Sequence, residues 1–128
     1  MAHFAAVRVD RSELLAIFAG GCLGALARAG LLEWLPHDPG SWPWSTFAAN
    51  VAGTALLGWA VTRLQERMPL TAYRRPFVGT GFCGALTTFS TLQVELLDMD
   101  AGLALAYASA SLAAGFGIVW LATGLARR

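Results

Sequence analysis

The chain has 128 residues, of which 56% are hydrophobic and only 13% are charged, and its mean hydropathy is +0.55. Soluble domains carry roughly 25% charged residues, so a soluble fold would leave too much apolar surface in water. The formal net charge of +1 gives no sign of a nucleic-acid partner or an acidic substrate. The length leaves no room for a second domain. We therefore expect one all-α membrane domain over residues 1–128, embedded in a lipid bilayer.

Four apolar segments predict four membrane-spanning helices, because about 20 residues cross ~30 Å of hydrocarbon. Ser12 is expected to cap the first of them near Glu13. A turn-rich loop over residues 33–41 precedes the second helix. An arginine-rich loop from Arg63 to Arg75 precedes the third. The predicted spans are residues 14–35, 44–62, 76–97 and 102–126.

The first predicted span carries a stripe of small residues and one arginine. Gly20 and Gly24 recur at helical spacing, which favours close contact between helices. Arg28 follows one turn later, near the far end of the span. It is either an anchor whose charge reaches the interface or a positive group at the mouth of an anion path. In the loop that follows, His37 is expected to be solvated, since no second histidine or cysteine stands near it.

The second and fourth predicted spans each carry polar residues at helical spacing. Asn50 can hold helices together through hydrogen bonds, or it can offer its two N–H donors to an anion. Tyr107 and Ser111 are four residues apart and share one face of the fourth span, whereas Ser109 lies on another face. This row is either packing or a hydrogen-bonding rail.

The third predicted span contains the most unusual stretch, GFCGALTTFSTL from Gly81 to Leu92. Four hydroxyls surround Phe89, and buried hydroxyls cost free energy unless they find partners. Irregular backbone at membrane depth survives only where protein covers it or where it lines a watery cavity. We therefore predict a broken helix that forms an ion or substrate site. The alternative is a continuous helix packed through Gly81 and Gly84, with hydroxyls bonded to their own carbonyls.

The arginines predict the orientation. With four spans, both termini and the middle loop share one side, and that side holds eight of the nine basic residues, all of them arginine. The other side holds Arg28 and five acidic residues. Arginine-rich segments stay in the cytoplasm, so we expect both termini to be cytoplasmic in a cell-membrane protein. Glu95, Asp98 and Asp100 are expected to form a short acidic turn before the fourth span.

These motifs resemble the bacterial CrcB or Fluc fluoride channels from about Gly20 to Gly117. The resemblance rests on GGCLGALAR at residues 20–28, Asn50 with two following glycines, GTGFCGALTTFST at residues 79–91, and the Tyr107/Ser111 pair. It implies four spans, a third helix broken mid-membrane, and an antiparallel (dual-topology type) dimer. It also implies a passive pore that exports fluoride and confers fluoride resistance, not an enzyme.

The resemblance also implies roles for particular residues. The backbone carbonyls of Gly84 and Thr87 are similar in position to ligands of one structural sodium ion at the dimer interface. Arg28 would lie in the vestibule. The expected fluoride pore residues are Asn50, Phe89, Ser90, Thr91, Tyr107 and Ser111.

Two features depart from that pattern. Leu92 stands where the family usually has a second phenylalanine, and the strong arginine bias does not suit insertion in both orientations. We hypothesise that an oppositely biased paralogue supplies the missing ring in a heterodimer. Pairing of two copies of this chain stays open.

Two other classes of membrane protein also fit the size of the chain. A small multidrug transporter needs a membrane-buried carboxylate in its first span, where Glu13 is the only candidate and stands at the helix entrance. A non-transporting membrane subunit is the second alternative. It predicts that replacing Asn50 or Phe89 affects only assembly or stability.

Overall fold

The computed structural model describes residues 10–67 and 73–128. Over these two ranges the chain forms helices and loops and no strand, as expected for an all-α protein. The elements in chain order are α1 (Arg11–Trp34), α2 (Trp44–Arg67), η1 (Pro76–Cys83), α3 (Gly84–Leu86), α4 (Ser90–Asp98) and α5 (Ala101–Ala126).

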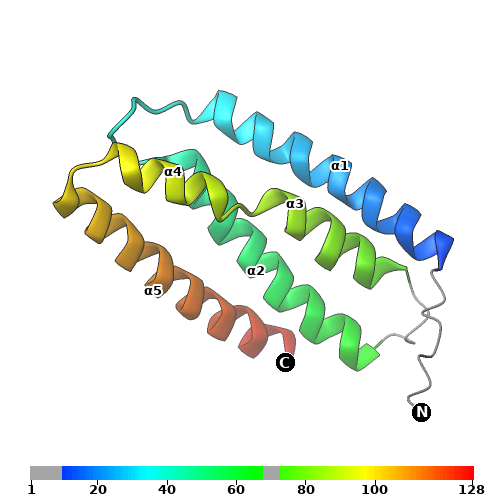
Figure 1. The fold of residues 1–128 in the computed structure, drawn as a ribbon. Helices are drawn as coiled ribbons and strands as arrows, with labels where there is room; N and C mark the ends of the chain where they lie inside the picture. The colour runs from blue at the N-terminus through cyan, green and yellow to red at the C-terminus, as the bar shows by residue number, and fades with distance from the viewer. Residues whose placement is uncertain (1–9, 68–72) are drawn as a thin grey trace, which may run out of the picture.

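The helices run back and forth in four passes, with η1, α3 and α4 together forming the third. The start of α1, the end of α2, the start of η1 and the end of α5 lie at one end of the bundle (Figure 1). Within the described ranges, α1 and α5 are long and apolar enough to cross a membrane. The 24-residue α2 is less apolar, and the break leaves both halves of the third pass too short for that test. The four passes agree with the expected number of helical segments, while two helices meet the criterion individually.

The ends of two predicted spans need correction. Ser12 does not cap α1, because the Asp10 carboxylate accepts a hydrogen bond from the Ser12 amide at 2.9 Å and the helix begins at Arg11. A carboxylate at this position is also favoured by the helix dipole. The loop expected from Arg63 is wrong at its start, since α2 continues to Arg67. Residues 1–9 and 68–72, which include the rest of that loop, lie outside the described residues.

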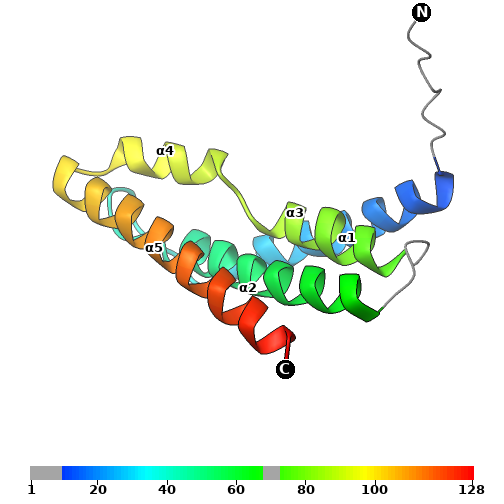
Figure 2. The same ribbon diagram turned by 90° about the horizontal axis from the view of Figure 1, so that it is seen from below.

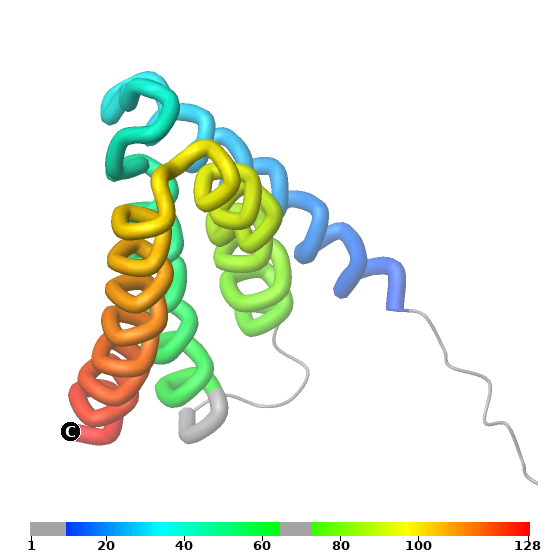
Figure 3. The backbone as a smooth tube through the Cα atoms, turned by 60° about the vertical axis from the view of Figure 1, so that its left-hand side comes forward, coloured from blue at the N-terminus to red at the C-terminus, as the bar shows by residue number. Residues whose placement is uncertain are grey.

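The small-residue stripe of α1 packs against the third pass, as predicted. A Cβ atom on Gly20 would collide with the carbonyl oxygen of Phe77, and one on Gly24 would collide with that of Phe82. Gly81 makes the same kind of contact from the third pass, since a Cβ added to it would lie 2.5 Å from the Ile17 carbonyl oxygen. Glycines thus let the two backbones touch. Farther along, α1 crosses the other helices obliquely (Figure 3).

The third pass is broken near its middle. The Thr87 amide still donates to the Cys83 carbonyl at 3.0 Å, but Thr87 itself is extended, with φ −77° and ψ 150°. Helical structure resumes at Ser90, and α4 is displaced from α3 across the extended linker (Figure 2). The predicted break is therefore confirmed and the continuous helix is wrong. The wide π-helical turns of η1, in which the Gly84 amide reaches the Gly79 carbonyl, were not predicted.

Candidate functional site

The break is held by a side chain from α2. Asn50 Nδ2 donates to the Thr88 carbonyl oxygen at 3.0 Å, and the Thr88 amide donates to Asn50 Oδ1 at 2.7 Å. Both backbone polar groups of Thr88 are thus satisfied by one amide side chain. Because buried backbone groups need partners, this pair of bonds lets the helix stop here. One Asn50 N–H donor is left for another acceptor.

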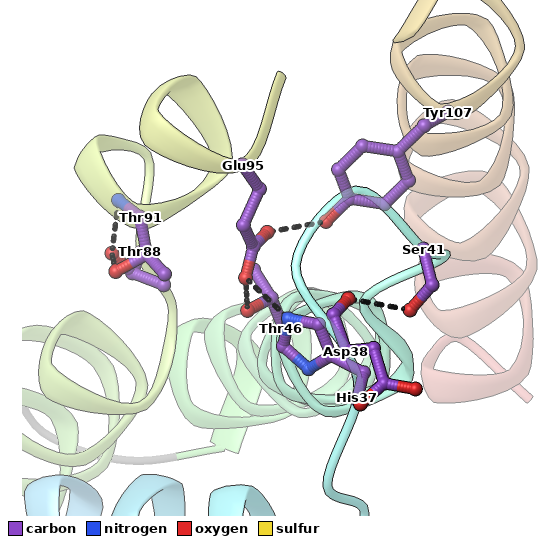
Figure 4. Close-up of polar contacts among 8 residues, drawn as sticks. All are labelled: His37, Asp38, Ser41, Thr46, Thr88, Thr91, Glu95 and Tyr107. Carbon is purple, nitrogen blue, oxygen red and sulfur yellow. Dashed lines mark hydrogen bonds and ion pairs between the residues drawn. The ribbon is translucent and has the colours of Figure 1, made fainter. Parts of the chain in front are cut away.

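The hydroxyl of Thr88 starts the second half of the pass. Thr88 Oγ1 accepts from the Thr91 amide at 3.2 Å and donates to Thr91 Oγ1 at 3.0 Å (Figure 4). Ser90 Oγ lies 3.4 Å from Thr88 Oγ1. Thr87 behaves differently, since its hydroxyl donates to the Cys83 carbonyl at 2.9 Å. The back-bonding alternative therefore holds for Thr87, while Thr88 caps α4 in the manner of a helix N-terminus.

Two cavities lie near the break, and polar side chains contribute to the lining of each. Buried Ser111 Oγ has no hydrogen-bond partner among the described residues. It opens on a cavity of about 30 Å³, enough for one water-sized particle, that Asn50 also lines. A second cavity of about 150 Å³ is lined by Arg28, Leu32, Ser45, Thr46, Thr88 and Thr91. Ser45 Oγ is likewise buried without a partner among the described residues.

Arg28, near the end of α1, lines the larger of these two cavities. It is half-buried, and no acidic side chain of residues 10–64 or 73–128 lies within 4.0 Å of its guanidinium. A cation beside hydroxyl donors favours a small anion. The structure thus brings together Arg28 with Thr91 in one cavity, and Asn50 with Ser111 in the other.

Glu95 is a site residue that the sequence analysis missed. It lies within α4, not in an acidic turn, and its side chain is only 11% exposed. Thr46 Oγ1 donates to Oε1 at 2.5 Å and the Tyr107 hydroxyl donates to Oε2 at 3.2 Å (Figure 4). The signal was its spacing, since Glu95 stands four residues after Thr91 and hence on the same helix face.

The loop between α1 and α2 also reaches this carboxylate. His37 Nε2 lies 3.9 Å from Glu95 Oε1, and the histidine side chain is 21% exposed. His37 is a loop residue, as expected, but its side chain is only partly exposed. The loop folds back because Ser41 donates to the Asp38 carbonyl through both its amide, at 3.0 Å, and its hydroxyl, at 2.7 Å.

The remaining predicted residues occupy contrasting environments. Tyr107 is fully buried, its ring 5.1 Å from that of Trp42, and its hydroxyl is engaged by Glu95. Phe89 is 72% exposed, so one chain does not bring its ring against a pore partner. Ser90 and Gly84 are exposed as well.

A helical bundle with two helices long and apolar enough to cross a membrane, and with a clasped break between them in the chain, is typical of a small membrane protein. The chain belongs to the CrcB family, because the family model described as "CrcB-like protein, Camphor Resistance (CrcB)" matches residues 15–123.

Characterised relatives extend this likeness over nearly the whole chain. The chain is 56% identical over 123 residues to "Fluoride-specific ion channel FluC 1" of Mycolicibacterium paratuberculosis, covering 93% of each chain. It is 42% identical to "Fluoride-specific ion channel FluC 2" of Nocardia farcinica, covering 93% of this chain and 88% of the relative. A FluC 1 of Streptomyces coelicolor is 38% identical, with 94% and 81% covered. These relatives are named as channels, which are not enzymes.

Proposed function

We propose that this chain is a subunit of a fluoride-selective passive channel of the cell membrane, which exports cytoplasmic fluoride and so confers fluoride resistance. The observation that carries the proposal is the clasped break at Thr87–Phe89, with two nearby cavities that polar side chains help to line. The names of relatives up to 56% identical support the identity of the ion.

Donors in the cavities replace the water that fluoride loses. Moving a small anion into protein costs tens of kcal/mol by Born reasoning unless donors solvate it. Asn50, with one N–H donor not used by Thr88, and Ser111, whose hydroxyl has no partner among the described residues, line one cavity, and Arg28 lines the other. Several weak sites of this kind favour conduction over tight binding. Ser90, Thr91 and Tyr107 would complete the polar path.

A second subunit completes the pore in this proposal. The 72% exposure of Phe89 leaves its ring free to present its positive edge to an anion between two subunits. We propose an antiparallel dimer, since that arrangement brings two broken helices together. The partner is either a second copy or a paralogue of opposite orientation that supplies the ring missing at half-buried Leu92.

A sodium ion at the dimer interface suits the backbone at the break. Sodium is a hard cation that prefers oxygen ligands, as other hard cations do. The extended conformation of Thr87 ends the regular helix, and the Thr88 amide, which would reach the Gly84 carbonyl in a continuous helix, donates to Asn50 Oδ1 instead. Gly84 and Thr87 would hold the ion through their carbonyl oxygens. When bound, the positive charge of the sodium ion would offset the negative charge of a passing anion.

The membrane potential supplies the driving force. The arginine bias favours both termini in the cytoplasm, and a negative interior pushes anions outward at about 2.3 kcal/mol per 100 mV. The drug-transporter alternative gains no support, because Glu13 is exposed in the first turn of α1.

Fluoride efflux from liposomes tests the proposal. Vesicles that contain this chain alone and are loaded with fluoride are expected to release the fluoride under a potassium diffusion potential. Vesicles loaded with chloride are expected to retain the chloride. Silence of the lone chain, with efflux restored by an oppositely biased paralogue, would support the heterodimer. Equal release of chloride and fluoride, or no release with either partner, would overturn the proposal.

A further inference from the structure

We propose that Asn50 and Thr88 expose the cation site, by drawing away the amide groups that would otherwise occupy the carbonyls of Gly84 and Thr87. Thr88 is then a positioning residue for sodium. This inference deepens the proposed function and rests on it.

The helical hydrogen-bond pattern identifies which amides are displaced. In an α-helix each carbonyl accepts from the amide four residues later, so Gly84 pairs with Thr88 and Thr87 pairs with Thr91. Here the Thr88 amide donates to Asn50 Oδ1 at 2.7 Å. The Thr91 amide donates to Thr88 Oγ1 at 3.2 Å. Two side chains thus receive the two amides that a continuous helix would direct at the expected sodium ligands.

The carbonyl just before this pair shows the contrast. Cys83 O accepts from the Thr87 amide at 3.0 Å and from the Thr87 hydroxyl at 2.9 Å, so it is fully used within the chain. Gly84, one residue later, is therefore the first residue whose carbonyl loses its helical amide donor to a side chain. A carbonyl oxygen that accepts no N–H donor can turn both lone pairs toward sodium, without the donor's partial positive charge beside the cation.

Packing against α2 fixes this arrangement. Thr88 is 9% exposed, and a Cβ on Gly53, one turn after Asn50, would collide with the Thr87 methyl group. The side chains at the break are thus pressed onto α2. Gly84, in contrast, is exposed, on a face that a second subunit can reach.

Substitution of Thr88 tests its role in positioning sodium through a measurement of stability that does not depend on fluoride conduction. The purified full chain is titrated with sodium chloride, against a choline chloride reference at matched ionic strength, and the sodium-dependent rise in melting temperature is measured. Thr88→Val keeps the shape of the side chain but removes the hydroxyl. Half-maximal stabilisation is then expected to need about threefold to tenfold more sodium, which corresponds to the loss of one net hydrogen bond. Thr88→Ser keeps the hydroxyl and is expected to restore the response to within about twofold.

Thr62→Val is the matched control. Its hydroxyl donates only to the Gly58 carbonyl within α2, at 2.8 Å, and its sodium titration is expected to match that of the unmodified chain. Amide hydrogen exchange gives a second readout, in which Thr88→Val speeds exchange at Thr91 but not along α5. If Thr88→Val does not fold, Thr88→Ala is compared with Thr88→Ser in the same assays.

An unchanged sodium titration in the variants that lack the hydroxyl would overturn the inference. It also fails if the unmodified chain shows no sodium response, because there would be no cation site to position. Fluoride efflux, measured on the same preparations, shows separately whether the proposed channel function stands.

Discussion

The Tyr107 hydroxyl of α5 donates to Glu95 Oε2 at 3.2 Å, while Thr46 of α2 donates to Oε1 of the same carboxylate at 2.5 Å. Glu95 therefore connects three helices beyond the break. Its hydrogen bonds hold α4, which otherwise makes few contacts with the rest of the chain (Figure 2).

Removing the Tyr107 hydroxyl is expected to loosen this connection. Tyr107→Phe leaves the ring packed but removes one hydrogen-bond donor to the Glu95 carboxylate, whose side chain is 11% exposed. The free energy of unfolding of the variant is therefore expected to fall by about 1 kcal/mol. A double-mutant cycle with Glu95→Gln in detergent measures the coupling, which we expect at ~0.5–2 kcal/mol. Independent, additive effects of the two substitutions would contradict a direct bond.

Gly24→Ala is expected to disrupt the contact between α1 and the third pass. The added methyl group would collide with the Phe82 carbonyl, and overpacking of this kind costs about 1–3 kcal/mol. Gly30→Ala on the same helix is the control, because nothing lies within 4 Å of its Cβ position. Thermal unfolding should show a lower melting temperature for the first variant alone. Equal effects would mean that the contact is not tight.

Ser111→Ala is expected to affect flux and stability in different directions. Its hydroxyl is buried without a partner among the described residues, so removing it should leave stability unchanged or raise it by ~1 kcal/mol. Fluoride efflux should fall, since one donor leaves the cavity shared with Asn50. Ser109→Ala, on an exposed face of α5, should change neither property. A large loss of stability in Ser111→Ala would instead assign the hydroxyl to packing.

Phe89→Leu is expected to abolish fluoride efflux without unfolding the chain. The ring is 72% exposed and contributes little to packing within one subunit. Phe116→Leu, in which an 82% exposed ring on α5 is replaced, is the matched control and should conduct normally. Circular dichroism and size-exclusion chromatography check fold and assembly. Normal efflux by Phe89→Leu would remove the aromatic edge from the proposed pathway.

Much of the fold follows from local sequence patterns. Apolar segments of membrane-spanning length predict the four passes, and Gly20 and Gly24 at helical spacing predict the close approach of α1 to another helix. Both depend on periodicity along one segment, which a single sequence displays. The break at Thr87–Phe89 was also predictable, because hydroxyls crowded into an apolar run conflict with an unbroken membrane helix.

The functional site was only partly predictable. Asn50, Ser111 and Arg28 stand out as polar residues in apolar segments, and the structure places each beside a cavity. The role of Glu95 was not visible, because three acidic residues within six positions resemble a solvated turn. Its burial depends on donors from Thr46 and Tyr107, which are distant along the chain.

The sequence by itself determined that the chain is a helical membrane protein with an interrupted third pass, because composition and periodicity are properties of single segments. Only the tertiary structure decided how the polar groups at the interruption are satisfied. Asn50 meets Thr88 across 38 positions of sequence, and His37 meets Glu95 across 58. Such pairings depend on the angles and separations at which helices pack, and side-chain identity alone does not set those.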